Sequence, residues 1–252
     1  MKNLIIAVAF LLISFGTIAQ GVDSTQTPSF FRGQLTATNN GVSLIPSFSL
    51  GKPAVLFDLN IGKGRLSFDP MLRFGMNGKP WTFVFWWRYK LIQRKRFTMG
   101  VGAHPSVVFR DMSVQTNGVE KEYLVAQRYF AWEAAPTWIV NKNLNFGVYY
   151  LGSRGLTKDI VQHTAFLVIR SSITLPLSNK FTLGLIPQTY YLKMDDKDGM
   201  YVNATVNLYR KKMPLSITGI MSKAIQTKII GKDFLWSVGL VYNLNTTYIK
   251  QK

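Results

Sequence analysis

The sequence contains no cysteine, only two histidines, and only 12 acidic residues against 30 Lys and Arg among its 252 residues. Without cysteine, neither a disulfide framework nor lipid attachment at a cysteine is available. Two separated histidines without a thiolate give a transition-metal site little to use, so we expect no metal and no cofactor. Beyond the N-terminus, no apolar run reaches the roughly 18 residues of a transmembrane helix. A membrane-spanning interpretation therefore requires strands.

The N-terminus has the layout of a secretory signal peptide. A short basic start, Met1–Asn3, runs into the mostly apolar stretch Leu4–Ile18, and the small residues Thr17 and Ala19 precede a predicted cleavage after Ala19. Export argues against a nucleic-acid partner. The formal net charge of +18 then points to a membrane surface as the anionic partner.

Apolar and polar residues alternate repeatedly along the chain, which is the pattern of strands with one apolar face. The alternation is clearest in the ranges 81–91, 97–110, 129–138, 201–209 and 234–244. The predicted apolar face of the first range is Trp81, Phe83, Phe85, Trp87, Tyr89 and Leu91, and that of the last is Phe234, Trp236, Val238, Leu240, Tyr242 and Leu244. Prolines fall on the apolar parity of predicted strands, where they indicate bulges or local breaks; they are Pro46, Pro70, Pro105, Pro136 and Pro187.

The connections alternate between tight basic turns and longer polar loops. The tight turns lie near residues 62–64, 92–96, 141–143, 178–180 and 210–213, and the longer loops near 75–79, 111–121, 153–160, 194–199 and 223–233. Outer-membrane barrels have short periplasmic turns and longer external loops, and two periplasmic chain ends require an even strand number.

We therefore predict an all-β fold, an antiparallel up-and-down transmembrane β-barrel of about twelve strands. The weakly alternating segment 30–38 is assigned to a lead-in, because its apolar face is poor. The predicted organisation is a signal peptide at 1–19, an N-terminal periplasmic lead-in at 20–41, the barrel at 42–245 and a periplasmic tail at 246–252.

The acidic residues are distributed unevenly. Eight of the 12 lie in or beside the predicted external loops: Asp111, Glu120, Glu122, Asp159, Asp195, Asp196, Asp198 and Asp233. None lies in a tight turn, and Asp23 lies in the lead-in. Basic turns at the inner leaflet would attract anionic phospholipid head groups. The alternative is that these turns are simply polar and rich in lysine.

The pattern resembles the outer-membrane β-barrel proteins of Gram-negative bacteria, in particular a small porin-like barrel. The final range 234–242 is similar to the terminal strand that the family's assembly machinery recognises, although a polar tail replaces the usual terminal aromatic residue. The resemblance implies an outer-membrane location, contact with outer-membrane lipids and the barrel assembly machinery, and room for an envelope protein partner. A soluble β-sandwich is the alternative, and it needs a second sheet over each apolar face.

The inward face of such a barrel is polar, and its charges can set ion or solute preference. By parity the lumen-lining residues are Asp58, Asp69, Arg73, Arg88, Lys90, His104, Glu133 and Arg170. Cationic or partly cationic groups outnumber carboxylates in this set, so an open pore should prefer anions. The alternative is that the charges pair with one another and fill a narrow lumen as a structural core.

One local motif suggests hydrolysis. In His104-Pro105-Ser106 a His and a Ser share one strand face, where the His can activate the Ser. The pair is similar to that of outer-membrane phospholipase A and lipid A deacylase, in which an Asn or Glu orients the His. Asn117 and Glu120 are the nearest candidates, but both lie in a predicted loop. Those families also place the pair on the lipid-facing surface, whereas parity here turns it inward, so we expect no enzyme.

Two further sites have simple explanations. His163 lies on the outward parity near an external strand end, and we interpret it as interfacial. The segment Asp195–Gly199 lacks the first ligand and the closing Glu of a calcium loop, so we interpret it as a polar hairpin loop. Three functions remain from the sequence: a narrow passive channel for small polar or anionic solutes, a closed structural or accessory barrel, and an outer-membrane lipid hydrolase.

Overall fold

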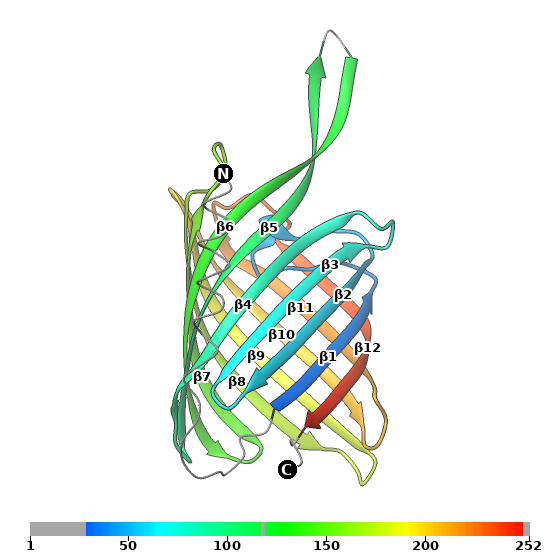
Figure 1. Ribbon diagram of the computed structural model, residues 1–252, viewed down its shortest axis with the longest axis vertical. Helices are drawn as coiled ribbons and strands as arrows, with labels where there is room; N and C mark the ends of the chain where they lie inside the picture. The colour runs from blue at the N-terminus through cyan, green and yellow to red at the C-terminus, as the bar shows by residue number, and fades with distance from the viewer. Residues whose placement is uncertain (1–28, 117–118, 249–252) are drawn as a thin grey trace, which may run out of the picture.

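The structure, a computed structural model, describes residues 29–116 and 119–248, without the side chains of 114–121 and 245–248. Twelve antiparallel strands form one closed barrel in which β1 pairs with β12 (Figure 1). Each of the other strands pairs with its neighbours in the chain. The predicted all-β, up-and-down barrel is confirmed. The predicted signal peptide at 1–19, Asp23 and Asn117 lie outside the described residues.

The strands are long enough to cross a bilayer, for which about 9–11 residues suffice. Their bounds are β1 Ser29–Thr38, β2 Ala54–Lys63, β3 Leu66–Gly75, β4 Pro80–Gln93, β5 Phe97–Thr116, β6 Val119–Asn141, β7 Leu144–Gly155, β8 His163–Pro176, β9 Phe181–Met194, β10 Lys197–Arg210, β11 Leu215–Thr227 and β12 Phe234–Tyr248. A 3-10 helix, η2, spans Pro46–Phe48. None of the described helices is long and apolar enough to cross a membrane.

The alternating pattern places apolar side chains on the outside of the barrel. In β12, Trp236 and Leu240 are 49% and 53% exposed, whereas the intervening Ser237 is 6% exposed. The same alternation exposes Trp87, Trp132 and other large apolar residues on other strands. A closed sheet that turns this surface outward meets the requirement for crossing hydrocarbon, because every strand edge is paired. The barrel is therefore of the transmembrane type.

Both chain ends of the barrel lie at one end, together with the tight turns. β1 begins and β12 ends at the end opposite the long β5–β6 hairpin, which projects beyond the barrel wall (Figure 1). The alternation of loop types has two exceptions. Only Asp195 and Asp196 join β9 to β10, and the predicted loop 111–121 is largely strand, because β5 and β6 continue into the hairpin.

Four of the five prolines on the predicted apolar parity lie inside strands, and each interrupts the ladder on one side only. Pro70 pairs with Phe85 of β4, but the β2–β3 register skips from Asp58–Met71 to Ile61–Phe68. The same one-sided gap occurs beside Pro105, Pro136 and Pro187. A proline has no N–H to donate, so each lies at a position where the strand on one side does not form ladder hydrogen bonds with it. The predicted local breaks are thus present at these four sites.

The barrel begins at Ser29, and not at Val42 as predicted. The segment assigned to the lead-in is β1, which closes the barrel between β12 and β2. Its lipid-facing positions include Gly33 and Ala37, which give a weak apolar signal. The strand predicted from residue 42 is instead a loop, so the count of twelve strands holds with a different first strand. At the other end, β12 continues to Tyr248, past the predicted boundary at residue 245.

Candidate functional site: the barrel lumen

The connection between β1 and β2, residues 39–53, folds into the lumen and forms an inner loop. Its 3-10 helix brings the Phe48 ring to 5.4 Å from the Tyr129 ring of β6. Trp81 Nε1 donates to the Phe48 carbonyl oxygen at 2.9 Å, and the Arg110 guanidinium donates to the Ser47 carbonyl oxygen. The Ser47 hydroxyl also contacts Met194 Sδ, at 3.7 Å. Inward-facing side chains of β4, β5, β6 and β9 therefore all hold this loop in the lumen.

Trp81 occupies a different face from the one predicted. The β3–β4 register shifts between Arg73 and Phe74, which pair with Thr82 and Pro80. This bulge turns Trp81 inward, where it is 1% exposed. Bulges re-aim side chains in this way, and the parity of the surrounding strand cannot reveal the change.

The inner loop is closed at its base by backbone hydrogen bonds. Gly41 N donates to the Lys52 carbonyl oxygen at 2.8 Å, and Leu50 N donates to the Gly41 carbonyl oxygen at 2.8 Å. A Cβ atom on Gly41 would lie 2.9 Å from Leu50 Cβ and 3.1 Å from the Trp81 ring. Only glycine fits at this closed base, which is called the neck of the loop. Because hydrogen bonds close the neck, residues 42–50 form a self-contained segment inside the barrel.

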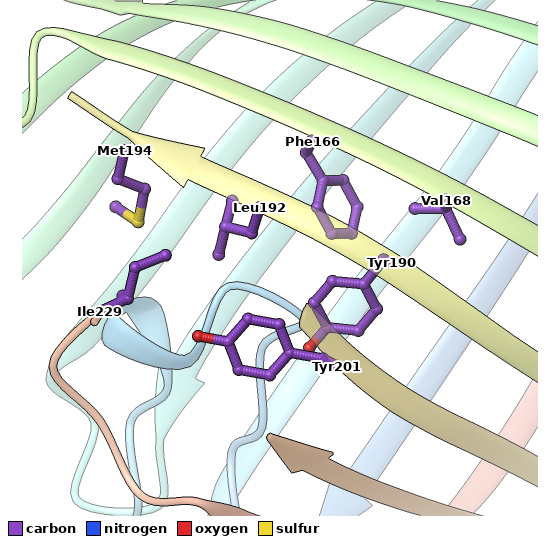
Figure 2. Packing of buried hydrophobic residues seen from close by; sticks show 7 residues of the cluster. All are labelled: Phe166, Val168, Tyr190, Leu192, Met194, Tyr201 and Ile229. Atoms are coloured by element: carbon purple, nitrogen blue, oxygen red, sulfur yellow. The ribbon is translucent and has the colours of Figure 1, made fainter. Parts of the chain in front are cut away.

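An inward-facing apolar cluster receives the loop (Figure 2). Leu44, Ile45 and Phe48 of the inner loop pack against it. The cluster comprises Phe166, Val168, Tyr190, Leu192, Met194, Tyr201 and Ile229. Sequence reasoning missed it, although the uninterrupted apolar run 165–169 of β8 is the signal of a strand covered on both faces. Part of the lumen is therefore a hydrophobic core.

A charged network crosses the lumen wall from β3 to β7 and is centred on Arg88. Its guanidinium forms ion pairs with Asp69 at 2.8 Å and with Glu133 at 2.6 Å. A second Arg88 nitrogen reaches Glu133 at 3.3 Å, so that pair is bidentate. Tyr149 donates at 2.8 Å to Glu133 Oε2, which also accepts the 3.3 Å hydrogen bond from Arg88, and Asn60 of β2 donates to Asp69. Such bidentate, charge-assisted contacts hold a fixed geometry.

The remaining predicted lumen residues are less tightly held. Asp58 and Arg73 are 3.8 Å apart. Lys90 lies 5.7 Å from the Phe30 ring, and the Arg170 guanidinium lies 5.8 Å from the Tyr149 ring. In the described part of the chain, neither Lys90 nor Arg170 has a carboxylate within ion-pair distance. His104 is buried against Trp86, with ring centroids 4.0 Å apart.

The opposite wall, formed by β9–β12, carries no charge at the cavity, and away from the apolar cluster it is largely polar. Gln188 donates to Asn203 at 2.9 Å, and Tyr190 shares a hydrogen bond with Ser222 at 3.2 Å. Asn207, Tyr209 and other hydroxyl or amide side chains line the cavity from this wall. The lumen thus has one charged wall and one neutral polar wall.

Two cavities lie in the lumen. The upper cavity, about 630 Å³, lies under the inner loop, and Val42, Ile45 and Phe48 form part of its lining. The lower cavity, about 310 Å³, lies toward the tight-turn end and is lined by Arg32, Asn60 and Asn243. Residues shared by the two linings are Gln34, Asp58, Met71 and Arg88. The Arg88 network therefore lies between the upper cavity and the lower cavity.

The proposed hydrolytic pair does not assemble a catalytic geometry. His104 and Ser106 both line the upper cavity, yet within the described residues no hydrogen bond joins them. Glu120 pairs with Gln115 near the hairpin tip, whereas Ser106 pairs with Tyr129. Nine residues of strand separate these levels, roughly 30 Å at about 3.3 Å per residue. Glu120 therefore lies too far along the strand to orient His104.

The two remaining sequence candidates have structural roles at the external end. Asp195 accepts hydrogen bonds from the backbone N–H groups of Gln162 and His163, the latter at 2.7 Å. This joins the β7–β8 loop to the β9–β10 turn. The His163 side chain is exposed. Over the residues described, no group of three or more His, Cys, Asp or Glu could hold a metal ion.

The fold is similar to that of solved porins. The KdgM porin in complex with disordered oligogalacturonate aligns with a TM-score of 0.53 at 8% sequence identity, covering 84% of this chain and 98% of that chain. The NanC porin aligns with a TM-score of 0.50 at 12% identity, covering 87% and 100%. No protein-family model matches the sequence, and no curated protein matches it by sequence. These likenesses show the fold: the chain is a porin-like β-barrel of the outer-membrane type.

Proposed function

We propose that the protein is a narrow passive channel of the outer membrane that prefers small anionic solutes. The observation that carries the proposal is the charge balance of the lumen. All three inward carboxylates, those of Asp58, Asp69 and Glu133, are paired with Arg73 or Arg88. Arg170 lines the upper cavity and Arg32 lines the lower one, each without a carboxylate partner among the described residues. Lys90, near the Phe30 ring, and Arg110, against the inner loop, also lack such a partner there. A lining with excess positive charge raises the local anion concentration.

The inner loop supports a narrow pore and argues against a wide one. It takes up space that would otherwise be open lumen and leaves two modest cavities, about 630 and 310 Å³. A solute would pass the loop, cross the upper cavity, move past Arg88 and leave through the lower cavity. No cofactor is needed for such passive movement, and the solute is the only partner the lumen itself requires.

The test is an ion-selectivity measurement on the purified protein in planar bilayers. Under a KCl gradient, the reversal potential should report preference for chloride, and Arg170→Gln should reduce that preference because it removes one unpaired lumen cation. Arg154→Gln is the matched control, since the adjacent Ser153 lines the cavity and Arg154 therefore faces away from it. Selectivity for potassium would contradict the proposal.

The second candidate is a closed accessory barrel that works through an envelope partner. The packing of the inner loop on the apolar cluster favours it, because a well-packed insertion can block a lumen. This candidate predicts no conductance from the intact protein. Lipid hydrolysis has the least support: His104 and Ser106 face the lumen, away from the lipid, without an orienting third residue.

A further inference from the structure

The upper cavity has two chemically different sides. On the side of the inner loop its lining is apolar and includes Ile45, Phe48, Phe166 and Val168. Its cations include Arg170 of β8, which lies nearer the tight turns than Phe166 and Val168 of the same strand, and Arg73, which lies beside Trp81 near the external end of β3. The tryptophans Trp81 and Trp86 also contribute to the lining. A general diffusion pore for hydrated solutes has no need of an apolar sector, which loses favourable contacts when water fills it.

Buried polar atoms around this cavity lack partners within the described protein. Arg73 Nε, His104 Nδ1 and Asp58 Oδ1 form no hydrogen bond. All three residues line the cavity, and His104 is only 6% exposed. Buried donors and acceptors are satisfied in the great majority of cases. Of these atoms, the Arg73 nitrogen is left to donate to a group that enters the cavity, whereas the Asp58 carboxylate disfavours an anion directly beside it.

The cationic side selects the charge of that group. Arg170 has no ion-pair partner among the described residues, and Arg73 holds Asp58 only loosely, at 3.8 Å. An entering carboxylate can accept hydrogen bonds from the Arg170 guanidinium, which is the contact that arginine makes best. A neutral solute would leave these cations without that compensation.

The apolar side selects the body of the ligand. The Phe166 and Phe48 rings and the Val168 side chain offer a surface where an apolar or aromatic group leaves water, as in most small-molecule sites. The volume, about 630 Å³, lies within the range of about 300–1,000 Å³ of such sites.

We infer that the upper cavity is a binding site for a small amphipathic anion, a carboxylate carried on an apolar or aromatic body. The inference rests on the proposed channel function and deepens it, because a binding site in the lumen makes passage selective and saturable. The carboxylate lies toward Arg170, and the apolar body lies under the inner loop against Phe166 and Val168.

The test is calorimetric titration of the full-length protein in detergent with three probes. Phenylacetate carries both features, phenylacetamide lacks the charge, and acetate lacks the apolar body. Phenylacetate should bind saturably, and each of the other two should bind at least about tenfold more weakly, as loss of one charged or apolar contact implies. Equal binding of all three probes, or no saturable binding of phenylacetate, would overturn the inference.

Variants tie the binding to the named arginine. Arg170→Gln should weaken phenylacetate binding about tenfold, the usual size of a lost charge-assisted hydrogen bond. Arg170→Lys should restore most of it, and Arg154→Gln should leave it unchanged. Unchanged binding in Arg170→Gln would contradict the assignment, and circular dichroism checks that each variant keeps its strands. Binding without conductance would reject the channel alone, and conductance without binding would reject this site alone.

Discussion

Arg88 organises the charged wall of the lumen through single-residue contacts. It holds carboxylates from two different strands, and one of them, Glu133, is only 7% exposed. Paired charges at low exposure are costly to separate, because the remaining partner keeps its desolvation cost. Arg88 also lies 4.4 Å from the Trp86 ring, which limits its freedom further. The Arg88 network, which lies between the two cavities, is therefore a rigid part of the wall.

Removal of the Glu133 charge tests this network. Glu133→Gln keeps the shape but replaces a bidentate ion pair, so the free energy of unfolding should fall by about 1–3 kcal/mol. The same change leaves the lumen more cationic and should strengthen anion selectivity. Denaturant unfolding and reversal potentials measure the two effects. Glu122→Gln, at an exposed site on the β5–β6 hairpin, is the control; unchanged stability in Glu133→Gln would contradict the network's role.

The inner loop is the element that decides how open the barrel is. Its neck is closed by backbone hydrogen bonds between Gly41 and both Leu50 and Lys52. Its tip contributes apolar residues to the lumen core, and side chains from several strands hold it. Because the excursion is self-contained, its removal should leave β1 and β2 paired.

Deletion of Val42–Leu50, with Gly41 joined to Gly51, should raise the single-channel conductance several-fold. The deletion removes the part of the apolar lining that the inner loop supplies, including Ile45 and Phe48, and widens the lumen. Phe48→Ala, which removes one apolar side chain of the loop and its contacts with Tyr129 and the apolar cluster, should give an intermediate value. Conductance equal to that of the intact protein would show that the loop does not limit the pore. Current from the deletion variant alone would favour the closed barrel.

On the scale of the whole molecule, the two ends of the barrel differ in charge: the tight-turn end is basic, whereas the opposite end carries both signs. The tight-turn end carries Arg65, Arg94, Lys95, Arg96, Lys142, Lys180, Arg210, Lys211 and Lys212. The opposite end carries most of the acidic residues, including Asp111, Asp159 and Asp195. Each basic residue near an anionic membrane surface contributes about 1 kcal/mol of attraction. We therefore propose that the tight-turn end contacts anionic lipid head groups.

Lipid composition should then change stability in a salt-dependent way. The melting temperature should be higher in nanodiscs that contain phosphatidylglycerol than in phosphatidylcholine alone, and the difference should shrink at high salt because charges are screened. Replacing Lys211 and Lys212 with Gln should reduce the difference. The control is Lys193→Gln, at the other end of the barrel. An equal effect of both variants would contradict contact at the tight-turn end.

Much of the lumen could be read from parity, because alternation is a local property of each strand. Asp58, Asp69, Arg88 and Glu133 all lie on the wall between the cavities or in its ion pairs. The distances between charged side chains depend on which strands become neighbours. They also depend on the strand register, which sets the position of each residue along the barrel axis. Parity therefore placed these four charges on the polar face of their strands, but it did not show that Arg88 would take two of the carboxylates.

The inner loop shows where this local reasoning ends. Residues 42–50 and the segment of β1 both contain apolar residues, and the former has the stronger signal. The stronger segment entered the lumen because the cluster around Phe166 and Tyr190 offers an apolar surface. The weaker one became β1, because two strand edges needed a partner to close the barrel.

The sequence alone therefore settled the side of the sheet that meets lipid, the closed antiparallel architecture and the even number of strands. These follow from period-two alternation and from the need to pair every backbone group, both of which are written along the chain. The inward turn of Trp81, the route of the inner loop and the division of the lumen into two cavities came only from the tertiary structure. They depend on contacts between segments that are distant in sequence, and no local pattern specifies such contacts.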